Sequence, residues 1–195
     1  MNGVEIAANG VMTLSVALAA RNSVHTWPSG IAGCTLLLIL FAGKQLYADA
    51  TLQLFFVVTS ILGWWQWEDP GAALAKMERP ITRARPRSLL AMSLLGTIVA
   101  IGYGWILHRF TDAYLPYVDS AVLILSVMAQ ILLMRRTLDT WFFWLAVNTI
   151  SVALFASRGL YLTAALYTAY WFNAWYGWWR WSKDLSPISV TAVTT

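Results

Sequence analysis

The sequence GWWQW at residues 63–67 recurs as GWWRW at residues 177–181. The offset of 114 positions holds without a gap well upstream of the second cluster. Of the 64 residue pairs that this offset aligns, starting at Val4 and ending at Trp67, about 19 are identical. A tryptophan-rich composition explains isolated matches, but not a run of this length at one offset. The chain is therefore predicted to contain a duplicated unit.

The composition predicts an integral membrane protein. The chain has 195 residues, of which 59% are hydrophobic and 11% are charged, whereas soluble domains have about 25% charged residues. Its net charge of +4 is interpreted as cytoplasmic loop charge rather than as nucleic-acid binding, because basic residues mark the inner loops of membrane proteins. The single cysteine, Cys34, excludes an internal disulfide.

Apolar stretches of about 17–25 residues can cross the hydrocarbon core as helices. Seven such stretches are predicted, at residues 4–20, 27–43, 50–65, 88–107, 118–134, 141–157 and 160–179. The first three align with the last three at the repeat offset, and the fourth has no counterpart. The expected fold is an all-α membrane protein with seven transmembrane helices in a 3+1+3 repeat.

The repeat is expected to be parallel, because corresponding helices lie four spans apart and therefore point the same way. This gives a pseudo-twofold axis along the membrane normal, as in SWEET transporters. With the N-terminus outside, ten Lys and Arg residues fall on the inner side and three on the outer side. Since basic residues favour the cytoplasm, the C-terminus is expected to be cytoplasmic.

Four regions follow from this organisation. They are a first three-helix bundle at residues 1–67, a linking region at residues 68–117, a second bundle at residues 118–181 and a polar cytoplasmic tail at residues 182–195. The linking region comprises a basic cytoplasmic loop, the linking helix and an outer loop. Its proline and arginine content between residues 66 and 87 indicates a solvated loop.

Enzyme function is not expected. The sequence has no metal-ligand spacing of His and Cys, no glycine motif for phosphate and no pair of carboxylates inside a predicted span. No metal or cofactor is therefore predicted. Polar residues inside a bilayer are costly unless they face a cavity or a partner, so such residues are the candidates for a transport pathway.

The candidate substrate-binding residues are Gln53, Gln130, Trp144, Asn148 and Tyr167. The repeat pairs Gln53 with Tyr167, and Cys34 with Asn148. A symmetric scaffold with an asymmetric lining suits an asymmetric substrate. The competing interpretation is that these amides only join helices, with an interaction worth roughly 0.6–2 kcal/mol. Asp119, at the start of the fifth predicted span, either complements the helix dipole or attracts a cation at the outer mouth.

Charged residues are absent from the middle of the predicted spans. Phosphate recognition relies on Arg and Lys, so a nucleotide is disfavoured as substrate. Proton-coupled carriers usually need an intramembrane carboxylate, so coupling to protons is disfavoured too. A neutral, aromatic, amide-rich pathway suits a flat ring that is weakly charged or cationic.

Three sequence features resemble the Pnu-type vitamin transporters. They are Asp119-Ser120, the run LSVMAQ at residues 125–130 and the pattern WxxWxxxNxxS at residues 141–151. The resemblance extends over nearly the whole chain and implies a SWEET-like fold in the bacterial inner membrane. It also implies import of nicotinamide riboside by facilitated diffusion, with trapping by cytoplasmic phosphorylation.

The resemblance predicts a uniporter with alternating access. Trp144 and Tyr167 are expected to stack on the substrate ring, while Gln53, Gln130 and Asn148 bond its ribose and amide groups. The expected partners are this vitamin nucleoside and membrane lipid, with no nucleic acid, and a homo-oligomer stays open. The alternatives are a transporter of thiamine or another vitamin, a proton-coupled carrier and a non-transporting membrane scaffold.

Overall fold

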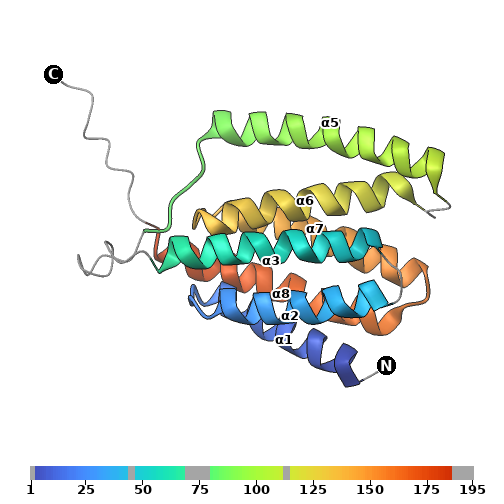
Figure 1. The fold of residues 1–195 in the computed structure, drawn as a ribbon. Helices are drawn as coiled ribbons and strands as arrows, with labels where there is room; N and C mark the ends of the chain where they lie inside the picture. The colour runs from blue at the N-terminus through green and yellow to red at the C-terminus, as the bar shows by residue number, and fades with distance from the viewer. Residues whose placement is uncertain (1–2, 44–46, 69–79, 112–114, 186–195) are drawn as a thin grey trace.

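The computed structural model describes residues 3–43, 47–68, 80–111 and 115–185 (Figure 1). This part of the chain is helical. Its helices are α1 (Gly3–Ala20), α2 (Thr26–Gly43), α3 (Tyr47–Trp67), α5 (Pro86–Phe110), α6 (Pro116–Met134), α7 (Thr140–Ser157) and α8 (Tyr161–Lys183). Each expected helix is present, with both ends within four residues of the expected positions. The largest shift is at the end of α8, because the helix continues past the GWWRW sequence at residues 177–181.

Local sequence explains where the later helices begin and end. Pro86 and Pro116 stand in the first turns of α5 and α6, where the missing proline N–H costs nothing. Gly159 follows α7 with a φ of 72°, the left-handed conformation that commonly ends a helix. The fourth predicted span ends at residue 107, whereas α5 continues to Phe110, so His108 is helical.

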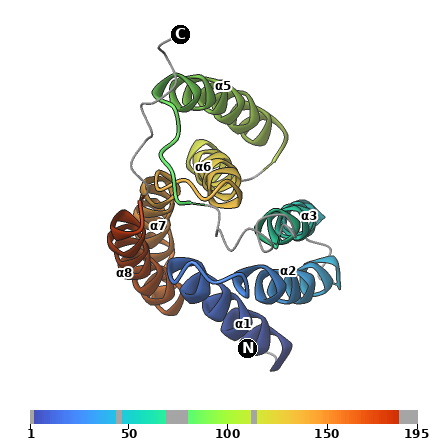
Figure 2. The same ribbon diagram turned by 90° about the vertical axis from the view of Figure 1, so that its left-hand side faces the viewer.

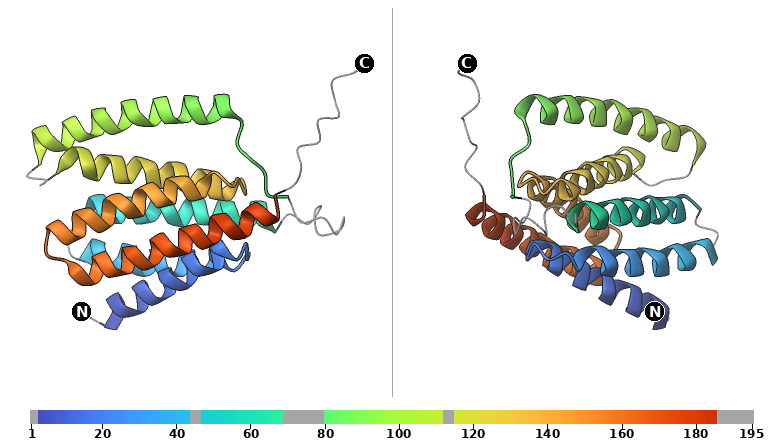
Figure 3. Two further views of the ribbon diagram at one scale, coloured as in Figure 1. Left: turned by 180° about the vertical axis from the view of Figure 1, so that it is seen from behind. Right: turned by 60° about the vertical axis from the view of Figure 1, so that its left-hand side comes forward.

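Six of the helices form a closed ring. Each contacts the next in the order α1, α2, α3, α6, α7, α8, and α8 contacts α1 in turn. Figure 2, an end-on view, shows this ring, with α5 outside it against α6. The two views of Figure 3 show the helices running side by side along one direction. The ring is thus made of two trios, α1–α3 and α6–α8, that meet at two seams: α3 against α6 and α8 against α1.

Several local contacts recur 114 residues apart. Thr26 Oγ1 donates to the Ser15 carbonyl at 2.9 Å. At the aligned positions, Thr140 Oγ1 donates to the Ala129 carbonyl at 2.8 Å. The turns that precede these two threonines contain the aligned residues Asn22 and Arg136, which share a left-handed φ of 53° and 51°.

The first glycine of the GWWQW sequence and that of the GWWRW sequence let neighbouring helices approach closely. A Cβ atom built on Gly63 would lie 2.5 Å from the ring of Trp27, and one built on Gly177 would lie 2.5 Å from the ring of Trp141. Since real Cβ atoms do not approach other atoms so closely, only glycine lets α3 pack on α2, and α8 on α7, at these points.

A buried cluster of side chains fills one end of the ring. All six ring helices contribute to it, and its largest members are Trp27, Trp67, Trp141 and Trp181. Trp27 meets Trp67 edge-on at 5.1 Å between ring centroids, and Trp141 meets Trp181 edge-on at 5.4 Å. These four residues are called the tryptophan cluster here. The neighbouring Trp65 and Trp179 are instead 75% and 50% exposed, as expected for residues at a membrane interface.

The segment before α5 differs from the expected solvated loop. Residues 80–84 form a strap that is hydrogen-bonded to the α6–α7 turn, and Ile81 is only 2% exposed within the buried cluster. The other strap residues remain exposed or partly exposed. The polar composition of this stretch gives no sign that one isoleucine within it is buried.

Four of the described helices are long and apolar enough to cross a membrane: α2, α5, α6 and α7. The helix α8 is comparably long but rich in Trp and Tyr, which lowers its hydropathy. The helix α5 is the most exposed, as expected for a helix that contacts α6 alone in the described part of the chain. In a bilayer its outer face would meet lipid.

Candidate functional site

Gln130 joins the two trios at the seam between α6 and α3. Its side chain is 7% exposed, and Nε2 donates to Thr59 Oγ1 at 3.5 Å. This is a long hydrogen bond, beyond the usual 2.7–3.2 Å range. The predicted site residue Gln130 therefore lies inside the ring and has a weak polar partner on the opposite trio.

The other seam carries a hydrogen bond between the aligned positions. Asn173 Nδ2, on α8, donates to the carbonyl of Val16, on α1, at 3.0 Å. Asn173 aligns with Thr59, and Val16 aligns with Gln130, at the 114-residue offset. Both seams are therefore bridged at one pair of equivalent positions, by side chains of different length and chemistry.

Asn148 lies buried on α7 at 4% exposure. Its side chain makes no hydrogen bond to another residue in the described part of the chain, and Ser151, one turn further on, is buried as well. Trp144, one turn before Asn148, packs against the buried cluster at the ring end. An amide without a protein partner in such a position is available to a polar solute.

Gln53 is partly buried on α3, and its Oε1 atom is buried with no hydrogen-bond partner within the described residues. Unpaired buried acceptors are costly, at about 1–3 kcal/mol, and are therefore uncommon unless a ligand or water satisfies them. Gln53 and Asn148 are thus both amides whose side chains lack a hydrogen-bond partner within the described residues.

Tyr167 belongs to an aromatic group on α7 and α8. Its ring centroid lies 5.1 Å from that of Phe155 and 5.7 Å from that of Tyr170. The Tyr170 hydroxyl hydrogen-bonds that of Thr13, on α1, at 3.0 Å. The aromatic group therefore reaches the seam between α8 and α1, where Asn173 also bonds.

The predicted site residues occupy four ring helices: Gln53 on α3, Gln130 on α6, Trp144 and Asn148 on α7, and Tyr167 on α8. In the described part of the chain no hydrogen bond or ring contact joins Gln53, Asn148 and Tyr167 to one another. Thr59, Tyr170 and Asn173 were not among the predicted residues. The repeat offset contained a usable signal, because it aligns Thr59 with Asn173 and both positions are polar.

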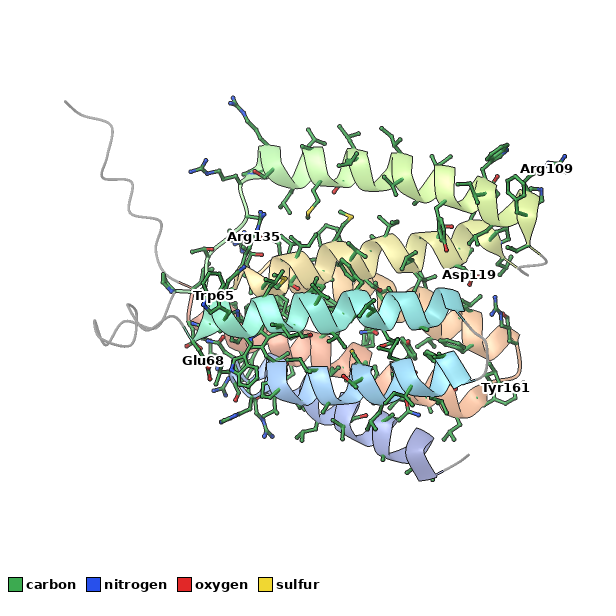
Figure 4. The ribbon with its side chains drawn as sticks, in the orientation of Figure 1. Trp65, Glu68, Arg109, Asp119, Arg135 and Tyr161 are labelled. Atoms are coloured by element: carbon green, nitrogen blue, oxygen red, sulfur yellow. The ribbon has the colours of Figure 1, made fainter. Side chains whose placement is uncertain are left out.

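Asp119 lies at the opposite end of the molecule from Arg135 and Trp65, as Figure 4 shows. It stands in the first turn of α6 and forms an ion pair with Arg158 at 3.4 Å. Both side chains are about one-third exposed. The ion pair adds a third interpretation to the two derived from the sequence, namely that Asp119 ties the start of α6 to the end of α7.

Within the described residues, no group of three or more His, Cys, Asp or Glu side chains is placed to hold a metal ion. Apart from Arg136 in the α6–α7 turn, the buried polar side chains among the described residues are amides and hydroxyls. Amides and hydroxyls of this kind can bind a solute by hydrogen bonding, and the aromatic side chains beside them can stack on a ring.

A family model described as nicotinamide mononucleotide transporter matches residues 2–183, nearly the whole chain. The chain belongs to the nicotinamide mononucleotide transporter family. It is a Pnu-type vitamin transporter and a multi-pass protein of the bacterial inner membrane. This membership confirms the family that the sequence features on α6 and α7 had indicated.

Curated relatives in this family carry two kinds of name. The nicotinamide riboside transporter PnuC of Escherichia coli (strain K12) is 27% identical over 177 residues, covering 79% of this chain and 74% of the relative. The riboflavin/roseoflavin transporter RibM of Streptomyces davaonensis is 26% identical over 192 residues, covering 94% of this chain and 88% of the relative.

The fold has a solved counterpart within the same family. The crystal structure of the vitamin B3 transporter PnuC superimposes with a TM-score of 0.72, at 21% sequence identity. The match covers 93% of this chain and 81% of that one. At this identity the similarity shows that the two chains share a fold.

Proposed function

We propose that this chain imports nicotinamide riboside by facilitated diffusion. The observation that carries the proposal is the PnuC relative, which aligns over 79% of the chain and is named as a nicotinamide riboside transporter. The amides of Gln53 and Asn148 lack hydrogen-bond partners among the described residues, and they support the proposal because nicotinamide riboside has hydroxyl and amide groups that need such partners. Its flat cationic ring suits stacking on aromatic side chains.

The proposed mechanism is uniport by alternating access. One trio would rock against the other about a central site, as is general for transporters built from repeats. Tyr167 and Trp144 would stack on the ring, and Gln53, Gln130 and Asn148 would bond the ribose and amide. A cytoplasmic kinase would then trap the riboside by phosphorylation. The absence of charged residues from the middle of the helices supports an uncoupled carrier.

We further propose that all seven helices cross the membrane as a parallel 3+1+3 repeat, with α5 as the linking helix. The equivalent hydrogen bonds, tryptophan pairs and seam contacts at the 114-residue offset support a duplicated trio. The excess of Lys and Arg at the end that carries Arg135 supports a cytoplasmic location for that end and for the C-terminus.

Riboflavin is the second candidate substrate. RibM aligns with a larger share of this chain, and of its own length, than the Escherichia coli transporter does. Riboflavin is also flat and carries hydroxyl groups, but its ring is neutral and larger. Thiamine and other vitamins remain alternatives within the same family.

The deciding experiment is uptake into liposomes that contain the purified protein. Labelled nicotinamide riboside, riboflavin and thiamine would be offered separately at equal concentration, without a proton gradient. We expect saturable entry of nicotinamide riboside alone, stopping when the inner and outer concentrations are equal. Entry of riboflavin alone would support the second candidate, and accumulation above the outer concentration would contradict uniport.

A further inference from the structure

The strap of residues 80–84 is tied to the second trio by three backbone N–H or C=O groups. Thr82 N donates to the Arg136 carbonyl at 3.1 Å, and the Thr82 carbonyl accepts from Leu138 N at 2.8 Å. Ala84 N donates to Asp139 Oδ2 at 2.7 Å. In Figure 2 this segment (green) runs from the ring out to the start of α5.

Ile81 is the part of the strap that enters the ring. It is buried in the same cluster as the four residues of the tryptophan cluster, which come from both trios. The strap also forms isolated bridges through Ile81 with Leu185 and through Thr82 with Thr137. Ile81 is therefore the side chain of the linking region that packs among residues of both trios at this ring end.

The buried cluster at this ring end has a fixed part and a part that is easier to move. The tryptophans belong to helices, and Trp67 Nε1 is additionally bonded to the Met134 carbonyl at 3.0 Å. The strap belongs to no helix and is held by a few hydrogen bonds and one apolar side chain. Withdrawing it disrupts fewer contacts than separating packed helices, so it is the least costly route through this end.

The symmetry of the scaffold leads to the same conclusion. The tryptophan pairs have equivalents in both trios, whereas the strap lies in the linking region, outside the aligned repeat.

The indole N–H groups of Trp27, Trp141 and Trp181 are buried without acceptors among the described residues. A solute with hydroxyl groups could accept hydrogen bonds from them once Ile81 has moved aside.

We propose that the strap is the cytoplasmic gate of the transport pathway, and that Ile81 is its plug. Opening requires Ile81 to leave the tryptophan cluster and Thr82 to release the α6–α7 turn. This inference rests on the proposed transport function and on the proposed orientation. The competing possibility is a static brace that stays attached to the second trio throughout the cycle.

A disulfide across the Thr82–Thr137 bridge tests the proposal. The double variant Thr82→Cys/Thr137→Cys would be made in a Cys34→Ala background, and uptake of labelled nicotinamide riboside would be measured in liposomes. We expect oxidation to lower the uptake rate at least tenfold and a reductant to restore it. Each single-cysteine variant, treated with the same oxidant, should transport at its untreated rate. Unchanged uptake with a fully formed disulfide would overturn the gate and leave the brace.

A labelling experiment tests the plug without requiring a disulfide. Ile81→Cys in the same background would be exposed to a thiol reagent on the cytoplasmic side, with and without nicotinamide riboside. We expect the riboside to accelerate labelling severalfold, because the buried side chain becomes accessible only when the gate opens. Arg83→Cys, at an exposed strap position, should label at one rate in both conditions. Labelling of Ile81→Cys at the same rate with and without the riboside would overturn the proposal.

The two failures are distinguishable. If the unmodified protein and the reduced double variant both lack nicotinamide riboside uptake, the proposed substrate is wrong and the same labelling test would be repeated with riboflavin. If both transport the riboside and the disulfide has no effect, the proposed substrate stands and the gate is wrong.

Discussion

Thr59 and Asn173 show that positions 114 residues apart carry different side chains at the two seams. They occupy equivalent positions, but Asn173 bonds a backbone carbonyl at 3.0 Å whereas Thr59 accepts a 3.5 Å bond from Gln130. The two seams therefore differ at these positions in side-chain chemistry and in hydrogen-bond length. A substrate with a ring at one end and a ribose at the other needs such a difference.

Asn148→Ala is predicted to weaken substrate binding about tenfold. The variant removes a buried amide that would bond the substrate, and a hydrogen bond of this kind is worth about 1.4 kcal/mol. Titration of labelled nicotinamide riboside onto purified protein measures the change. Thr97→Ala on α5 is the control, because Thr97 is exposed and, among the described residues, its hydroxyl bonds only the Ser93 carbonyl of its own helix; it should bind as the unmodified protein does. Equal affinities for both variants would remove Asn148 from the site.

Asp119→Asn is predicted to have a small effect on uptake and stability. Its ion pair with Arg158 is partly exposed, and exposed ion pairs contribute about 0–1 kcal/mol. We expect uptake to stay within about twofold at low and high salt. If the variant instead loses tenfold or more of its uptake rate, and high salt lowers uptake by the unmodified protein to the same extent, Asp119 attracts the cationic substrate.

At the scale of elements, the close packing at Gly63 and Gly177 predicts what happens when either glycine is replaced. Gly63→Ala and Gly177→Ala each place a Cβ atom against a tryptophan ring, and overpacking of this kind costs roughly 1–3 kcal/mol. Each variant should unfold at a lower temperature in detergent, as followed by tryptophan fluorescence. Gly102→Ala on α5 is the control, because nothing lies within 4 Å of a Cβ atom there. Equal melting of all three variants would contradict the packing described for α3 and α8.

The helices could be predicted from sequence because membrane spans have a strong local signal, namely long apolar stretches bounded by polar residues. The strap could not, since Ile81 stands among prolines and arginines and its burial depends on partners from both trios. The burial of Gln130 and Asn148 follows from their position within apolar helices, while their role in substrate binding stays a prediction. The bonds of Asn173 and Tyr170 to α1 depend on how the second seam closes, which no local pattern encodes.

At the scale of the whole molecule, the proposed orientation can be tested at the C-terminus. Seven spans with the N-terminus outside would put the C-terminus in the cytoplasm. A fluorescent protein that matures only in the cytoplasm, fused after Thr195, should therefore fluoresce, while a periplasm-dependent phosphatase fused there should be inactive. The reverse pattern would overturn the orientation and move the strap to the outer side.

The central claim is that the ring conducts nicotinamide riboside down its gradient. The most direct measurement is the time course of labelled nicotinamide riboside in liposomes that contain the purified protein alone, with no ion gradient. The predicted result is saturable uptake that ends at equal inner and outer concentrations and is slowed by Asn148→Ala. Uptake no faster than in protein-free liposomes would contradict the account.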